Sequence, residues 1–195
     1  MSERLESQMR FLGEVERLKT VYRQNKTVDG SRYENSAEHS WHVALMAIVL
    51  IEHADNSSLD LSKIVTMLLL HDLVEIYAGD TWAYDSEALQ DQEVRERDAA
   101  QRVFSLLPAD QAERFQALWK EFEARDTPEG SFAAAIDALQ PLSNHLQSAT
   151  TENGYEPLEE SRVLERKRHI GLSSQALWET AQQIVKASTA RGLYR

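Results

Sequence analysis

The chain has 195 residues, of which 42% are hydrophobic and 27% are charged, as in an ordinary soluble globular domain. It contains no cysteine, so disulfides, thiolate metal sites and cysteine nucleophiles are excluded. Its formal net charge of −11 disfavours binding to a nucleic acid polymer, and its longest apolar run, Val43–Ile51, is too short to span a membrane. Because the N-terminal segment lacks an apolar stretch of the signal-peptide kind, we expect a cytoplasmic protein.

Apolar residues recur at helical spacing in the first half of the chain. One stripe runs from Phe11 to Val21. A second helix is expected from Asn35 to about His53, because Asn35 can cap it and Glu38 can reach back to complete a capping box. A third helix, over residues 61–77, is apolar on all sides and is expected to end before Gly79.

The second half continues the helical pattern after a loop over residues 79–85. A charged helix with a solvated face is expected over 86–107, and the stripe containing Trp119 and Phe122 indicates a core helix. In the next helix Pro141 is expected to cause a kink or an end. No strand pair is evident. We predict one all-α domain, 1–195, of seven or eight helices, with its chemistry in residues 17–140 and helices 158–190 packed on it.

The helix over residues 61–77 carries polar residues that a plain core would avoid. The apolar run Met67–Leu70 leads directly into His71 and Asp72. A buried carboxylate must be paired or bind a metal, because its desolvation alone costs several kcal/mol. Glu75 lies on the same side of the helix and can act as a base beside an ion. A hydrogen-bonded histidine beside a capping aspartate is the alternative, but the clustering of three such residues favours a metal site.

Two further polar residues interrupt apolar helices. His39 falls in the first helical turn after Asn35, where the helix dipole favours a neutral imidazole that can bind a metal. His42 is a weaker candidate, and packing beside the ligands is the preferred interpretation for it. Asp137 is the single carboxylate in the segment 132–139. Its sequence context does not decide between a ligand and a residue at the solvent edge.

These residues together resemble a known family. The set consists, in chain order, of Glu38-His39-Ser40, His71-Asp72 with Glu75, Gly79-Asp80, and a late single Asp137. It is similar to the HD-domain metal-dependent phosphohydrolases, and within them to the small branch that includes the 5′-deoxynucleotidases. The resemblance runs from about Arg17 to Asp137. It implies an HD-domain helical bundle and a homodimer.

The resemblance also implies roles for individual residues. One divalent ion would be held by His39, His71, Asp72 and Asp137, with Glu75 as the catalytic acid/base. The substrate would contact Arg23, Arg32, Asp80 and Thr81. Gln24 follows Arg23 where the family has a tryptophan that helps to exclude a 2′-hydroxyl, so the choice between ribose and deoxyribose stays open.

Two imidazoles and two carboxylates suit Mn, Co, Fe, Ni or Zn as the divalent ion. The leading hypothesis is hydrolysis of a nucleoside 5′-monophosphate to nucleoside and phosphate. One alternative is a triphosphohydrolase or a phosphodiesterase acting on another nucleotide. The other is a non-enzymatic helical interaction module. Such a module is expected to lack ligands that this chain retains.

Overall fold

The computed structural model of the protein describes residues 2–150 and 157–195. Nine α-helices occur among these residues: Glu3–Val15 (α1), Ser36–Leu50 (α2), Leu61–Leu70 (α3), Glu75–Ala78 (α4), Gln92–Phe104 (α5), Ala109–Ala124 (α6), Pro128–Ser148 (α7), Glu160–Lys167 (α8) and Gln175–Ala190 (α9). A 3₁₀ turn over His71–Val74 joins α3 directly to α4. Counted as continuous runs, the described helices number eight, which confirms the all-α prediction.

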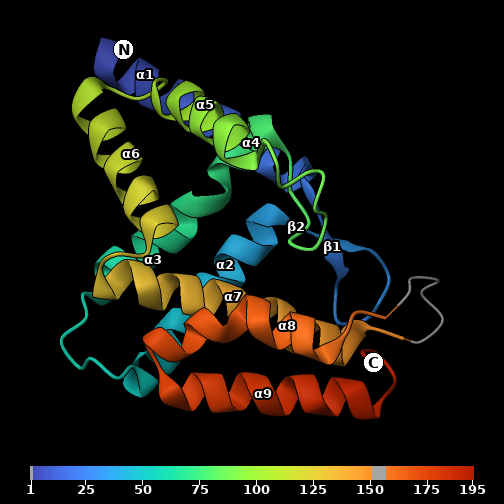
Figure 1. The fold of residues 1–195 in the computed structure, drawn as a ribbon. Coiled ribbons are helices and arrows are strands. Elements are labelled where there is room, and N and C mark those ends of the chain that lie inside the picture. Colours follow the sequence, from blue (N-terminus) through green and yellow to red (C-terminus); the bar gives the residue numbers. More distant parts are fainter. Residues whose placement is uncertain (1, 151–156) are drawn as a thin grey trace.

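Helices α2 and α3 form a central pair, and the other helices form two groups on either side of it (Figure 1). Helices α1, α5 and α6 lie at one end of the molecule, and α7, α8 and α9 lie at the other. Helix α3 packs against both α2 and α7, while α9 packs on the opposite side of α7. Helix α8 contacts both α7 and α9.

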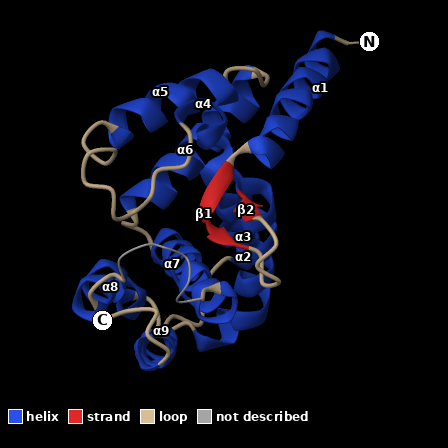
Figure 2. Cartoon of the chain, turned by 90° about the vertical axis from the view of Figure 1, so that its right-hand side faces the viewer, coloured by secondary structure: helices blue, strands red, loops and turns tan. Residues whose placement is uncertain are grey.

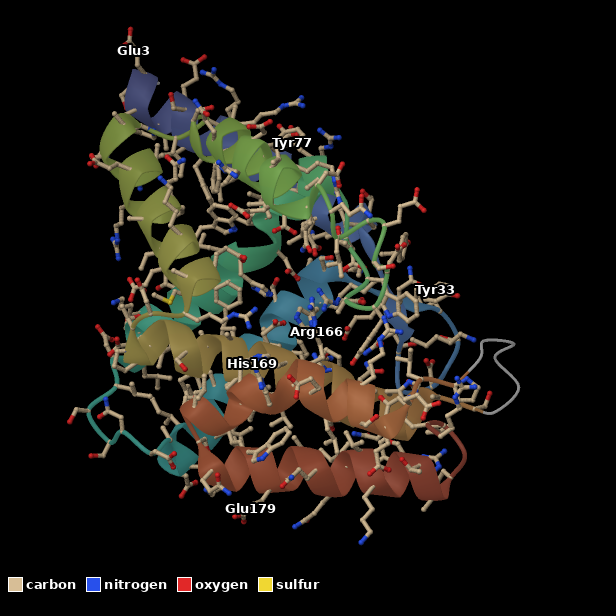
Figure 3. The ribbon with its side chains drawn as sticks, in the orientation of Figure 1. Glu3, Tyr33, Tyr77, Arg166, His169 and Glu179 are labelled. Atoms are coloured by element: carbon tan, nitrogen blue, oxygen red, sulfur yellow. The ribbon has the colours of Figure 1, made fainter. Side chains whose placement is uncertain are left out.

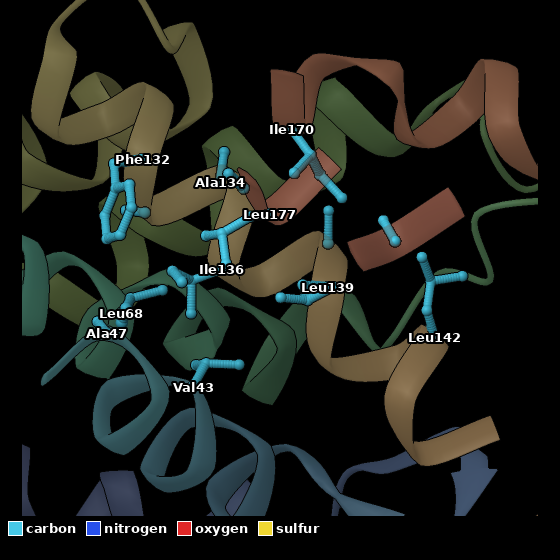
Figure 4. Close-up of a cluster of buried hydrophobic side chains, with 14 of the residues drawn as sticks. Val43, Ala47, Leu68, Phe132, Ala134, Ile136, Leu139, Leu142, Ile170 and Leu177 are labelled. Atoms are coloured by element: carbon cyan, nitrogen blue, oxygen red, sulfur yellow. The ribbon is translucent and has the colours of Figure 1, made fainter. Parts of the chain in front are cut away.

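Each group of helices encloses its own apolar core. The larger core joins α2, α3, α7 and the C-terminal helices, and includes the fully buried side chains of Val43, Leu68 and Ile136 (Figure 4). Each such side chain stabilises the fold by about 1.5–3 kcal/mol through removal of apolar surface from water. The smaller core lies between α1, α5 and α6 and contains Trp119, as the helical stripe predicted. The 3₁₀ turn over His71–Val74 connects the two cores.

Two short strands correct the expectation that the chain has no strand pair. Strands Tyr22–Lys26 (β1) and Tyr33–Asn35 (β2) form an antiparallel hairpin, red in Figure 2, with an irregular register between its ends. Gly30 closes the hairpin with φ of 70°, a conformation that glycine adopts without strain. The sequence of β1 is polar and lacks β-branched residues, so periodicity could not reveal it.

Two helix bounds also differ from the prediction. Helix α5 begins at Gln92 rather than near residue 86, because the Asp85 carboxylate accepts hydrogen bonds from the backbone of Glu87 and Ala88 in a preceding turn. Pro141 does not end α7, which continues to Ser148. Burial of the following Leu142 in the larger core offsets the hydrogen bond that proline cannot make.

Candidate metal centre

Three elements bring the predicted ligands into one cluster. His39 comes from α2, His71 and Asp72 from the 3₁₀ turn, and Asp137 from α7. Asp137 Oδ1 lies 2.9 Å from His39 Nε2 and 3.6 Å from His71 Nε2. His71 Nε2 lies 2.9 Å from Asp72 Oδ1. One ligand atom from each of His39, His71 and Asp72 lies within 4.8 Å of the other two.

The donor atoms fit a first-row divalent ion. Ligands about 2.1 Å from such an ion and at right angles to one another are about 3 Å apart, close to these separations. The Nδ1 atom of His71 donates to the carbonyl oxygen of Leu68 at 2.8 Å, which leaves the lone pair on Nε2. This Nε2 atom is buried and has no hydrogen-bond partner among the described residues. An unsatisfied buried nitrogen facing carboxylates is what a metal ligand requires.

His39 is oriented by a hydrogen-bond chain that the sequence did not reveal. Its Nδ1 atom donates to Gln140 Oε1 at 3.1 Å, and Gln140 Nε2 donates to Glu34 Oε1 at 3.0 Å. This arrangement leaves the Nε2 lone pair of His39 facing the cluster. Gln140 is fully buried and lies three residues after Asp137. A polar residue at this helical spacing from a candidate ligand was the one signal in the sequence that could have indicated its role. His42 contacts the same amide at 3.4 Å rather than joining the ligands.

The start of α2 fixes the position of His39. Asn35 accepts a hydrogen bond from the Glu38 backbone at 3.0 Å, and the Glu38 carboxylate accepts one from the Asn35 backbone at 3.2 Å. The predicted capping box is therefore confirmed. Burial, together with the positive charge of Arg23, lowers the pKa of His39, so its imidazole is neutral and able to bind a metal.

The carboxylate of Asp137 is ionised in this environment. Burial alone would raise its pKa, but the imidazoles of His39 and His71 close to its Oδ1 atom hold the pKa well below its usual range. The same carboxylates act on His71, where burial lowers the pKa but Asp72 and Asp137 raise it well above 6.5. A negative potential that attracts a proton to His71 Nε2 also attracts a metal cation to it.

Glu75 lies beside the cluster and not within it. Its carboxyl group is buried, and its Oε2 atom accepts a hydrogen bond of 2.5 Å from Ser36 Oγ at the start of α2. Burial and the neighbouring charge of Asp72 raise the pKa of Glu75 well above 4.5. A carboxyl group with a raised pKa can hold a proton near neutral pH and release it to a reacting atom.

Arg23 is surrounded by carboxylates. Its Nη1 atom donates to Asp72 Oδ2 at 3.0 Å and lies 3.8 Å from Asp80 Oδ1 and 4.0 Å from Glu75 Oε1. Burial lowers the pKa of Arg23, but Asp72 and Glu75 more than offset it, so the guanidinium stays charged. Its charge is therefore largely balanced by protein groups.

A cavity of about 550 Å³ opens onto the cluster, a volume suited to a small organic ligand. The predicted residues that line it are Arg23, Gln24, His71, Asp72, Glu75, Asp80, Thr81 and Asp137. Thr81 Oγ1 accepts a hydrogen bond from Arg95 at 3.2 Å, which fixes the loop after α4. Trp82 and Tyr84, from the same loop, line the cavity as well, with ring centroids 5.7 Å apart.

Arg32 does not line this cavity. It lies in the hairpin turn, half-exposed, and its guanidinium makes a two-pronged ion pair with the Glu38 carboxylate at 2.8 and 2.6 Å. The resemblance implies a substrate contact for Arg32, whereas its guanidinium in the structure pairs with the Glu38 carboxylate. Figure 3 shows the nearby Tyr33 at the outer edge of the hairpin.

Comparison with known proteins identifies the family. A family model described as an HD domain matches residues 15–178. This chain belongs to the HD domain family. A solved structure from Magnetospirillum magnetotacticum MS-1, named a predicted metal-dependent phosphohydrolase, shares 42% sequence identity with it over 99% of each chain, with a TM-score of 0.89.

Curated relatives are less similar in sequence. The human 5′-deoxynucleotidase HDDC2 is 29% identical over 70% of this chain, and the match spans only 65% of the human protein. The 5′-deoxynucleotidase Ent638_2835 of Enterobacter sp. (strain 638) is 27% identical over 80% of this chain and 81% of its own. No described helix of this HD-domain protein is both long and apolar enough to cross a membrane.

Proposed function

We propose that this protein is a metal-dependent phosphohydrolase that converts nucleoside 5′-monophosphates to nucleosides and phosphate. The observation that carries the proposal is the buried, unpartnered Nε2 atom of His71 among ionised carboxylates at the wall of a nucleotide-sized cavity. The names of the similar proteins support a phosphohydrolase in general and a 5′-deoxynucleotidase in particular.

The proposed ligands of one divalent ion are His39, His71, Asp72 and Asp137. When bound, an ion of the Mn, Co, Fe, Ni or Zn group would lower the pKa of a water molecule and neutralise charge on a phosphoryl group. The hydrogen bonds from His71 to Leu68 and from His39 to Gln140 keep both Nε2 atoms available for this purpose.

Glu75 is the proposed acid/base. Water adds to phosphorus, the bond from phosphorus to O5′ breaks, and O5′ must receive a proton. The Glu75 carboxyl group is buried against Ser36, and its pKa is raised by burial and by the charge of Asp72, so it is suited to deliver that proton and to recover one from the attacking water. Ser36 orients the carboxyl group by hydrogen bonding to Oε2.

The remaining cavity residues supply the proposed contacts to the nucleoside. Asp80 and Thr81 would contact the sugar, and Arg23 would hold Asp72 and Asp80 in place while it faces the phosphate. Gln24 replaces an aromatic barrier to the 2′-hydroxyl, so we include ribonucleotides among the proposed substrates. Trp82 and Tyr84 offer surfaces on which a planar base can stack. We assign Arg32 to the α2 cap through Glu38.

Release of orthophosphate from a panel of ribo- and deoxyribonucleoside 5′-monophosphates, with Mn²⁺ or Co²⁺ added, tests this function. We expect turnover that disappears on chelation and returns with the metal. Absence of turnover from every monophosphate, with the metal bound, would contradict the proposal. Product analysis with nucleoside triphosphates and cyclic nucleotides distinguishes the alternative enzymes, and metal analysis of the purified protein tests the non-enzymatic module.

We also propose that the chain acts as one domain and forms a homodimer. Helix α2 supports the dimer, because Trp41, Leu45, Ile48 and Val49 recur at helical spacing and are each at least 43% exposed. A second copy of the chain would cover this stripe. A cytoplasmic location follows from the proposed substrates, because nucleoside monophosphates are made and consumed there.

A further inference from the structure

Four cationic side chains line the cavity: Arg23, Lys26, Arg125 and Lys167. Arg23 already pairs with Asp72 at 3.0 Å. Lys26 lies at the end of β1 and also borders a separate shallow groove beside the hairpin. Lys167, by contrast, is the last residue of α8, and it lines the same cavity as the cluster at Asp137.

Lys167 has no hydrogen-bond or ion-pair partner among the described residues. Over residues 2–150 and 157–195, no carboxylate lies within 4.0 Å of its ammonium group and no acceptor takes its hydrogen bond. Its side chain is nevertheless only partly exposed, and its charge is close enough to interact with both Asp137 and Arg23. A partly buried ammonium without an acceptor adds little to the stability of the fold. Its position is better explained by an anionic ligand in the cavity.

Other basic residues increase the positive potential near Lys167. Arg125, on the cavity wall, caps α6 in a left-handed conformation with φ of 55° and ψ of 24°. It is the one non-glycine residue with positive φ among the described residues, and such outliers concentrate at functional sites. Arg166 precedes Lys167, and Figure 3 shows its side chain extending from α8 away from α9. Positive charge therefore gathers on this side of the cavity, which the carboxyl group of Glu123 also lines.

We propose that the ammonium group of Lys167 binds the phosphoryl oxygens of the substrate. Arg23 would then fix the carboxylates, and Lys167 would supply the free positive charge that a phosphate dianion requires. Arg125 would add a weaker attraction from the neighbouring position on the wall. The identity of the anion as a nucleotide phosphate rests on the proposed function, whereas the binding of an anion at Lys167 does not.

The protonation of Lys167 is compatible with this role. Burial lowers its pKa to about 8, Asp137 acts in the opposite direction, and Arg23 and Arg166 add to the lowering. At pH 7 the amine is therefore mostly charged, and a bound phosphate would stabilise the charged form further.

Calorimetric binding of inorganic phosphate to the Mn²⁺-loaded protein tests the proposal without turnover. We expect Lys167→Met to weaken phosphate binding by about 10- to 100-fold, the usual effect of losing a charge-assisted hydrogen bond. Lys167→Arg, which keeps the charge, should stay within a few-fold of the unchanged protein. The matched control is Lys186→Met, on the exposed side of α9, which should bind phosphate normally.

The same variants distinguish a binding role from a structural one. Because no described residue pairs with Lys167, Lys167→Met should keep its metal content and melt within a few degrees of the unchanged protein. The KM of Lys167→Met for a nucleoside monophosphate should rise. The more polar Lys167→Gln provides a second neutral variant if the methionine variant folds poorly. Normal phosphate affinity in either folded, metal-loaded neutral variant would overturn the proposal.

Failure of this inference and failure of the proposed function give different results. If phosphate binding depends on Lys167 but no monophosphate is hydrolysed, the anion site is correct and the nucleotidase function is wrong. If monophosphates are hydrolysed and neither phosphate affinity nor KM changes in the neutral variants, the function is correct and the assignment of Lys167 is wrong.

Discussion

Glu75 lies four residues after His71 and buries its carboxyl group against Ser36 at the edge of the metal cluster. It contributes no atom to the cluster of His39, His71 and Asp72. Its position and its raised pKa are consistent with proton transfer rather than metal binding. Removal of this group should therefore affect the chemical step while the ion stays bound.

We expect Glu75→Gln to lower kcat for monophosphate hydrolysis by about 10²- to 10⁴-fold, the usual contribution of general acid–base catalysis. Metal content should remain unchanged, because the amide fills the same space beside Ser36. Steady-state kinetics and elemental analysis of the same samples measure both. Glu93→Gln on the exposed face of α5 is the control, and a Glu75→Gln variant with normal kcat would exclude the proposed role.

Gln140 allows a separate test of how His39 is held. Its amide accepts from His39 and donates to Glu34, so replacement by leucine leaves the imidazole free to rotate and Glu34 without its donor. We expect Gln140→Leu to weaken metal binding by about 10- to 100-fold, measured by competition with a chromogenic chelator. Gln147→Leu, at an exposed position of the same helix, should have no effect. Equal metal affinities would show that the hydrogen bond is dispensable.

The sequence revealed the residues that interrupt apolar runs, and it missed those that support them. His71 and Asp72 were recognisable because Met67–Leu70 precedes them directly. Gln140 hydrogen-bonds a histidine 101 positions away, and local periodicity carries no information about such a contact. The same limit applies to Lys167, whose relation to the cavity depends on how α8 packs against α7.

At the scale of the element, the start of α2 has both a structural and a chemical role. The capping box at Asn35 satisfies free backbone donors and sets the turn that carries His39 and Ser36. Both of its partners are recognisable from the sequence, because Asn35 and Glu38 have the spacing of a capping box before an apolar run. The other elements near the site were less evident from the sequence. Strand β1 is polar, and Pro141 lies inside α7, which continues past it because Leu142 is buried.

We expect Asn35→Ala to destabilise the metal-free protein by about 1 kcal/mol, which corresponds to a fall of about 2–4 °C in Tm for a chain of this size. Metal affinity should fall as well, because the turn that carries His39 loses its fixed start. Thermal melts and metal competition are the measurements. Asn56→Ala in the exposed loop before α3 is the control. An unchanged Tm would mean that Glu38 and Arg32 hold the helix start without Asn35.

At the scale of the whole molecule, the exposed stripe on α2 predicts assembly. Light scattering should give twice the chain mass of 22.2 kDa for the unchanged protein. Trp41→Glu places a charge in the middle of the proposed interface, where Trp41 is 64% exposed, and should give the monomer mass. The control is Leu172→Glu, because Leu172 is exposed and apolar but lies outside α2. A monomeric unchanged protein, or a dimeric Trp41→Glu variant, would contradict this interface.

The stability of the whole molecule should also depend on pH through His169, which follows α8. Burial, with the nearby charges of Arg125 and Lys167, lowers the pKa of His169 to about 4. The unfolded chain binds a proton at this histidine near pH 6.5, and the folded chain does so only near pH 4. As the pH falls through this window, the unfolded state binds more protons, so His169 destabilises the fold progressively.

We therefore expect His169→Gln to lose less Tm than the unchanged protein between pH 7 and pH 5, with both proteins metal-free. The comparison removes the contributions of the metal ligands, because these are common to the two proteins. His53→Gln, at an exposed position after α2, should follow the unchanged protein. Parallel curves for the unchanged protein and His169→Gln would mean that His169 accepts its proton as readily in the fold as in the unfolded chain. The effect of the positive charges of Arg125 and Lys167 on His169 would then be weaker than the structure implies.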